Sequence, residues 1–144
     1  MGPKSAGAEP GPVCYGRGGT EPTVTDCNLM LGYLGRHQLL AGNMPLDHAA
    51  AEAAIGQRLA IPLGVDVRTA ASAVIDVVNH AMAEALKIVS VQRGHDPRDF
   101  ALAAFGWAGP LHATALAEEL GIAAVVCPPI PGARSEERRV GKEC

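Results

Sequence analysis

The residues best placed to do chemistry form a short glycine-containing turn that leads into a helical pattern. The turn consists of Gly106, Trp107, Ala108 and Gly109, and Pro110 follows as a favourable first residue of a helix. Glycines let a backbone approach a ligand closely, and the N–H groups at a helix start attract anions. The turn is therefore a candidate nucleotide site, although most strand-to-helix turns with two glycines bind no ligand.

Two side chains are candidates for a catalytic role. His112 falls in the first turn of the following helix, where the dipole favours a neutral imidazole that can donate to a phosphate or substrate oxygen. A histidine that packs and caps locally is the equal alternative. Asp26 could orient a metal-bound water or a substrate amide, or it could hold a helix start, and the capping role is favoured. No metal site is predicted, because the four cysteines include no C-x-x-C pair and His37, His48 and His95 share no ligand spacing.

Three helices are predicted before the turn. The first is short, is capped by Thr25 or Asp26 and continues through Leu34. The second spans residues 47–59 and is stopped by a proline and a glycine. The apolar residues that suit its buried face are Ala50, Ala53, Ala54 and Leu59.

The third helix has the clearest pattern. It is predicted over residues 67–93, with Asp66 as its N-cap and Gly94 beyond its end. His80 and Lys87 on this helix are interpreted as solvated positions of a scaffold. The apolar residues at helical spacing are Val67, Ala71, Val74, Val78, Ala81, Ala85 and Val89.

The pattern changes after residue 97. Residues 100–105 form a short apolar run that predicts a strand covered on both faces, residues 110–120 a helix, and residues 122–127 a second strand. If the two strands pair in parallel, the unit crosses over right-handedly. The predicted fold class is α/β.

Two groups of motifs are family signatures. Residues 2–31 contain six glycines and four prolines, including the runs CYGRGG at 14–19 and PTVTD at 22–26. Residues 108–113 read AGPLHA, and only Trp107 separates them from the Phe-Gly pair at 105–106. With these motifs the chain resembles the hydantoinase A / 5-oxoprolinase family of ATP-dependent enzymes over nearly all of residues 1–133. It departs from the family at Trp107, where a second glycine is usual, and at Cys27, where alanine is usual.

The resemblance implies a partial actin-like ATPase domain of the sugar-kinase and Hsp70 type, with long helices and a strand–helix–strand unit. In such domains a glycine-rich turn lies against the adenosine, which implies ATP and Mg as cofactors. The implied function is ATP-dependent opening of a small cyclic amide such as a hydantoin or 5-oxoproline, with a second (B-type) subunit or domain as partner. The alternatives are an ATP-dependent ketone carboxylase subunit or an inactive scaffold fragment. A nicotinamide-dinucleotide binder is disfavoured because the G-x-G-x-x-G spacing is absent.

Both ends of the chain are expected to be cut from a longer reading frame. Residues 134–144 (RSEERRVGKEC) resemble a translated sequencing adapter and are expected to lie outside the fold, while Met1 stands where the family has valine. Residues 1–133 are then a piece of the ATPase domain. The Asp-x-Gly-Gly-Thr phosphate loop of the family is absent from the sequence, so the piece alone is expected to be inactive.

Composition and charge argue against several other classes of protein. With 48% apolar and 19% charged residues, the chain is typical of one globular core. A net charge of −3 and the lack of a basic stripe argue against nucleic acid as a partner. No apolar run reaches the roughly 18 residues of a membrane span, so a membrane partner is not expected. We expect a cytoplasmic location.

Overall fold

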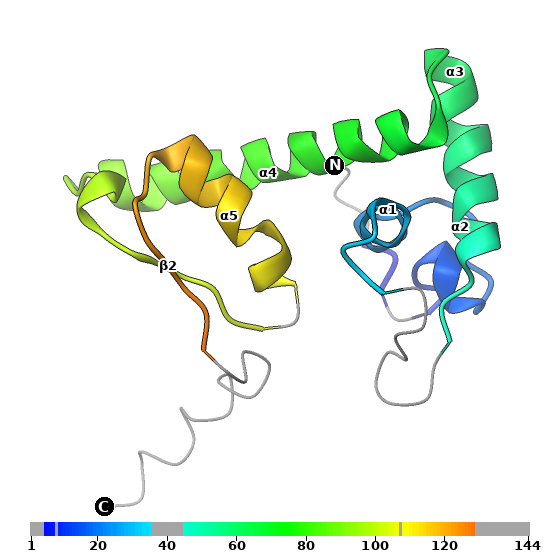
Figure 1. Cartoon of the computed structure of the whole chain (residues 1–144), viewed down its shortest axis with the longest axis horizontal. Coiled ribbons are helices and arrows are strands. Elements are labelled where there is room, and N and C mark those ends of the chain that lie inside the picture. Colours follow the sequence, from blue (N-terminus) through cyan, green and yellow to red (C-terminus); the bar gives the residue numbers. More distant parts are fainter. Residues whose placement is uncertain (1–4, 8, 36–44, 107, 129–144) are drawn as a thin grey trace, which may run out of the picture. The chain divides into compact units, whose positions relative to one another are not determined.

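The computed structural model describes residues 5–7, 9–35, 45–106 and 108–128 (Figure 1). The expectations for Met1, Trp107 and residues 134–144 fall outside the described residues. The chain divides into two compact units, Met1–Val78 and Asn79–Cys144.

The first unit begins with the glycine- and proline-rich run, which turns through the 3-10 helix η1 (Val13–Tyr15) and leads into α1 (Val24–Leu31). Thr23 is the N-cap of α1 and forms a capping box with Asp26 in the first helical turn. The helix thus begins before the predicted caps. It ends ahead of the predicted Leu34, because the residue after Leu31 is a glycine at φ 83°, which terminates the helix.

The second helical segment contains a π-helical turn. Helix α2 (His48–Ile55) begins one residue after the predicted start, because Asp47 is its N-cap and accepts a backbone N–H on Oδ1 at 2.9 Å. The chain continues through the π-helical segment η2 (Gly56–Ala60) into the short helix α3 (Ile61–Leu63). Pro62 has no N–H to donate to the preceding turn, and a wider turn before it accommodates that loss.

The π-helical turn changes which face of this segment is buried. Ala51, Ile55 and Ala60 are buried, a spacing of four residues and then five. A regular α-helical period does not produce that spacing. The predicted buried face is also wrong within α2 itself, before the π-helical turn, where the buried residues lie one position beyond those predicted. Its members are all exposed or only partly buried: Ala50, Ala53, Ala54 and Leu59.

The longest element is α4 (Val67–Val91), whose 25 residues span about 37 Å. Its predicted N-cap Asp66 accepts the backbone N–H of Thr69 at 2.9 Å. The predicted buried face is correct at Ala71 and Val78.

The predicted face of α4 is wrong in the second half of the helix. Ala81, Ala85 and Val89 are exposed, and Ala83 is buried instead. The prediction followed an approximate seven-residue repeat, and a straight helix with 3.6 residues per turn drifts away from such a stripe.

The second unit contains the predicted strand–helix–strand arrangement. After the 3-10 helix η3 (Pro97–Asp99), strand β1 (Leu102–Ala103) pairs in parallel with β2 (Val125–Val126), and α5 (Gly109–Leu120) connects the two strands. The parallel pairing and the α/β class are confirmed.

The strands are shorter and more exposed than predicted. Each has two residues, and Phe105 and Val126 are 59% and 56% exposed. Coverage of the strands on both faces is therefore wrong for the described residues, because a single helix can cover only one side of a small sheet.

Small apolar side chains fill the interior of both units. One cluster of the first unit packs Cys27 and Ile55 with residues of α4, and a second joins Cys14 and Leu29. In the second unit Ala83 of α4 packs against two leucines of α5. None of the helices in the described part of the chain has the length and hydropathy needed to cross a bilayer.

Gly19→Ala is expected to destabilise the first unit. A Cβ at Gly19 would press against the carbonyl oxygen of Gly11, inside van der Waals contact. The loop backbone would have to move, at a cost of about 1–3 kcal/mol in the free energy of unfolding, which urea titration measures.

The matched control for this substitution is Gly56→Ala. Gly56 is helical at φ −55°, and a Cβ there would meet only Val67 Cγ2, at an ordinary 3.6 Å. Its unfolding free energy should stay the same or rise by up to about 1 kcal/mol. Equal losses in the two variants would show that the close approach at Gly19 is not what limits substitution.

Candidate functional site

A fully buried carboxylate, Asp26, joins separate parts of the first unit. Its Oδ1 accepts the N–H of Cys14 at 2.8 Å, and its Oδ2 accepts the N–H of Val13 at 3.2 Å. Oδ2 also accepts the backbone N–H of Thr23 at 2.7 Å and the Thr23 hydroxyl at 2.8 Å. Because Asp26 lies in the first turn of α1, its charge also sits at the positive end of the helix dipole.

These hydrogen bonds account for the burial of the charge. An ionised carboxylate leaves water at a large cost unless donors replace its solvation, and here three backbone N–H groups and one hydroxyl do so. Asp26 therefore helps to hold the helix start, as the third helical residue of the capping box and not as the N-cap itself. Orientation of a metal-bound water or a substrate amide by this side chain stays a prediction.

The cysteines beside this carboxylate are inert thiols. Cys14 and Cys27 are 0% and 1% exposed. Burial, followed by the nearby Asp26 charge, raises the pKa of Cys14 far above its ordinary value, and the same causes raise the pKa of Cys27 to about 11. A protonated thiol is a poor nucleophile and a poor metal ligand, so both cysteines serve the packing of the first unit.

A groove of mainly apolar character lies on the first unit. Arg58 and Glu21, which line it, form an ion pair at 2.8 Å. The groove was missed in the sequence, because its walls come from the glycine-rich run, α1, η2 and α4, which are distant along the chain. Its other lining residues include Pro10, Gly19, Thr23, Cys27, Leu59 and Val74.

The glycine turn of the second unit leads directly into α5. Gly106 adopts φ 82°, a left-handed conformation that favours glycine. Gly109 is the first helical residue, and the nearest atom to a Cβ built there is the carbonyl carbon of Ala104 at 4.0 Å. Gly106 is thus required by the conformation of the chain, whereas the conformation leaves room for a side chain at Gly109.

The start of α5 offers few donors to an anion. Pro110 has no N–H, and the N–H of Leu111 donates to the Ala108 carbonyl at 3.1 Å. Ala108, the N-cap residue, makes no side-chain cap. The backbone here suits close approach to an uncharged group such as a nucleoside better than it suits binding of a polyphosphate.

His112 is buried against an asparagine of α4. The ring is 5% exposed, and its Nδ1 lies 2.8 Å from Oδ1 of Asn79. An amide oxygen only accepts, so with this partner Nδ1 carries the proton and Nε2 of a neutral ring is an acceptor. Burial lowers the pKa of His112, which also favours the neutral form. Nδ1 is thus paired with Asn79 inside the chain, and a catalytic role of His112 stays a prediction.

The candidate residues are divided between the two units. Gly106, Ala108, Gly109 and His112 all lie on the connection from β1 through α5, whereas Asp26 belongs to the other unit. Sequence reasoning missed Asn79. The signal was available, because a polar residue next to Val78 interrupts the apolar stripe of α4, and buried polar side chains require partners.

Comparison with known proteins identifies the family. The profile of the hydantoinase/oxoprolinase family (Hydantoinase_A) matches residues 1–136. The chain therefore belongs to the hydantoinase/oxoprolinase family, which confirms the resemblance drawn from its motifs.

Individual relatives match the chain over most of its length. It is 52% identical over 130 residues to caprolactamase subunit alpha of Pseudomonas jessenii, covering 90% of this chain and 19% of the relative. It is 47% identical over 131 residues to the acetophenone carboxylase gamma subunit of Aromatoleum aromaticum, covering 91% of this chain and 18% of the relative. The chain thus spans about a fifth of the length of these relatives.

Solved structures agree with these matches. The crystal structure of the ATP-dependent caprolactamase from Pseudomonas jessenii superposes with a TM-score of 0.84 at 52% identity, covering 90% of this chain and 19% of that one. A nucleotide-free acetone carboxylase superposes with a TM-score of 0.82 at 33% identity, covering 91% and 18%. The fold of the chain is that of the corresponding segment in both enzymes.

Asp26→Asn is expected to lower the free energy of unfolding by about 2–4 kcal/mol. The new amide would place a donor where backbone N–H groups already donate, and the buried charge would be lost. Asp66→Asn provides the control, since this cap is exposed and its replacement should cost much less than that of the buried Asp26. Urea unfolding compares them, and similar losses would show that Asp26 acts only as a surface cap does.

His112 is expected to make the stability depend on pH below the ordinary histidine pKa of 6.5. Since burial lowers the pKa in the folded chain, the unfolded chain binds more protons in the window just below 6.5, and stability falls as the pH falls through it. His112→Gln should flatten this slope in urea titrations between about pH 7 and pH 5. An unaltered slope in His112→Gln would assign the dependence to other groups.

Proposed function

We propose that the chain is part of the ATPase subunit of an enzyme that uses ATP to open a cyclic amide. The observation that carries this proposal is the match to the ATP-dependent caprolactamase, at 52% identity and a TM-score of 0.84 over 90% of the chain. We further propose that residues 1–133 are one segment of a longer, cytoplasmic subunit with an actin-like ATPase core. A second, B-type subunit or domain would complete its active site.

The β1–α5 connection is the part of the chain that we assign to ATP. Gly106 adopts the left-handed conformation that makes the turn, and Gly109 leaves its backbone open to a flat ligand. The scarcity of donors at the start of α5 favours contact with the adenosine. The phosphates and a Mg ion would be held by other parts of the subunit, since this sequence has no Asp-x-Gly-Gly-Thr loop.

ATP would supply a phosphoryl group that turns the oxygen of a stable amide into a good leaving group. The residues of this chain would act by positioning. His112, held neutral by burial and oriented by Asn79, presents Nε2 as an acceptor, and the Asp26 hydrogen bonds fix the glycine-rich run. A hydantoin, 5-oxoproline or a larger lactam would be the substrate.

A ketone carboxylase is the second candidate. It is favoured by 47% identity to the acetophenone carboxylase gamma subunit and by the superposition on acetone carboxylase. An inactive scaffold is the third alternative, and it predicts that substitutions in the glycine turn have no effect on catalysis.

A chimeric enzyme tests these functions. Residues 1–133 would replace the matching segment of the Pseudomonas jessenii caprolactamase alpha subunit, assembled with its partner. We expect ATP-dependent opening of a lactam and no ATP-dependent carboxylation of acetone or acetophenone. Carboxylation by the chimera would favour the second candidate.

Two substitutions in the chimera test the nucleotide contact. Gly109→Ala should raise KM for ATP by about tenfold, because the methyl group would separate the backbone from the ligand, while the fold has room for it. Trp107→Gly should lower KM for ATP by restoring the glycine usual in the family. Unchanged values for both variants would remove the turn from the ATP site, and a higher KM in Trp107→Gly would mean that the indole stacks on the base.

A further inference from the structure

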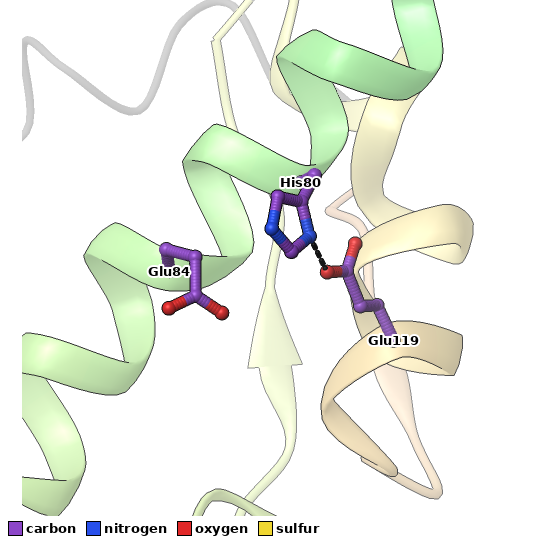
Figure 2. A group of neighbouring side chains, drawn as sticks. All are labelled: His80, Glu84 and Glu119. Atoms are coloured by element: carbon purple, nitrogen blue, oxygen red, sulfur yellow. Dashed lines mark hydrogen bonds and ion pairs between the residues drawn. The ribbon is translucent and has the colours of Figure 1, made fainter.

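Three side chains of types that can bind metal ions lie close together on the surface of the second unit (Figure 2). They are His80 and Glu84 of α4 and Glu119 of α5, and one ligand atom of each lies within 4.8 Å of the others. His80 Nδ1 and Glu119 Oε1 are already 2.6 Å apart. All three are exposed, and none has a role in the proposed reaction.

The helices hold these side chains together independently of any ion. His80 and Glu84 are four residues apart and therefore share one face of α4. Glu119 reaches them because α5 packs on α4 through a buried contact of Ala83 with Leu116 and Leu120. The ligand geometry thus rests on apolar packing beneath it, which reduces the entropy lost on binding.

We propose that His80, Glu84 and Glu119 form a binding site for a divalent transition metal ion of the Zn²⁺ class. One imidazole and two carboxylates are a donor set that Zn²⁺ accepts, whereas Mg²⁺ and Ca²⁺ prefer oxygen ligands alone. Three protein ligands leave a fourth position for water. The ion would link α4 to α5 one residue away from Asn79, the partner of His112.

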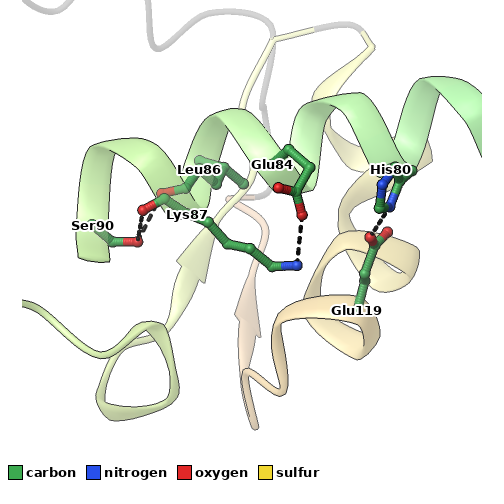
Figure 3. A network of polar contacts seen from close by, with 6 residues as sticks. All are labelled: His80, Glu84, Leu86, Lys87, Ser90 and Glu119. Atoms are coloured by element: carbon green, nitrogen blue, oxygen red, sulfur yellow. Dashed lines mark hydrogen bonds and ion pairs between the residues drawn. The ribbon is translucent and has the colours of Figure 1, made fainter. Parts of the chain in front are cut away.

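The ion competes with two existing contacts, the hydrogen bond between His80 Nδ1 and Glu119 Oε1 and the ion pair of Glu84 with Lys87. Lys87 Nζ lies 2.8 Å from Glu84 Oε1 (Figure 3), so Glu84 must exchange this ion pair for the metal. The same figure shows that Lys87 and the His80–Glu119 pair approach Glu84 from different sides. Removing the ammonium group should therefore strengthen metal binding, and the comparison with Glu118→Gln distinguishes a specific ligand set from unspecific attraction of a cation by carboxylates.

Isothermal titration of the complete 144-residue chain with ZnCl₂ tests the site. We expect one site, weakened by about tenfold or more in each of His80→Ala, Glu84→Gln and Glu119→Gln. Lys87→Gln should bind Zn²⁺ several-fold more tightly. Glu118→Gln, which removes the same charge from an exposed neighbour on α5, should bind as the unchanged chain does. MgCl₂ should give no comparable binding.

Co²⁺ absorption separates this site from the cysteines. A site of nitrogen and oxygen ligands lacks the thiolate-to-metal charge-transfer band that Cys127 would produce. Zn²⁺ should also slow amide hydrogen exchange in residues 109–120, since it ties α5 to α4. Zinc affinity that is undetectable, equally strong in all three ligand variants, or lost equally in Glu118→Gln would overturn the proposal.

Discussion

The ordering of the first unit depends on hydrogen bonds to one buried anion. Its glycine- and proline-rich run has few large side chains to bury, and each glycine loses more backbone entropy on folding than other residues do. Asp26 compensates by accepting from Val13, Cys14 and Thr23 at once, so the loop and the start of α1 become ordered together. The cluster of Cys14 and Leu29 then packs against Ala51 of α2, so the ordered run is joined to the helices by apolar contacts.

Local chemistry made much of this fold predictable. Asp66 is an N-cap as expected, because a carboxylate and an N–H three residues later are enough to form a cap. The strand–helix–strand order was also visible, since short apolar runs flanked a helical pattern. The exact buried faces of the helices were not predictable from the sequence. The π-helical turn before Pro62 and the drift along α4 depend on hydrogen-bond geometry that residue spacing does not display.

The candidate site was predictable only in part. The glycines of the β1–α5 connection indicate a tight turn, and the residue type is sufficient for that prediction. The proton on His112 depends instead on Asn79, which lies 33 positions earlier and comes near only after α4 and α5 have packed. Pairings of this kind are decided by tertiary structure, so a motif can locate a histidine without telling in which direction its hydrogen bond points.

The glycine- and proline-rich run is held in place by hydrogen bonds to the carboxylate of Asp26, although two cysteines lie beside that carboxylate. Cys14 and Cys27 are free and buried, and their raised pKa values keep the thiolate that would start disulfide exchange scarce. The hydrogen bonds to Asp26 therefore need no oxidising compartment, and changes in the cellular thiol redox state do not break them. A loop ordered in this way keeps its shape in a reducing environment, where a disulfide staple would be opened.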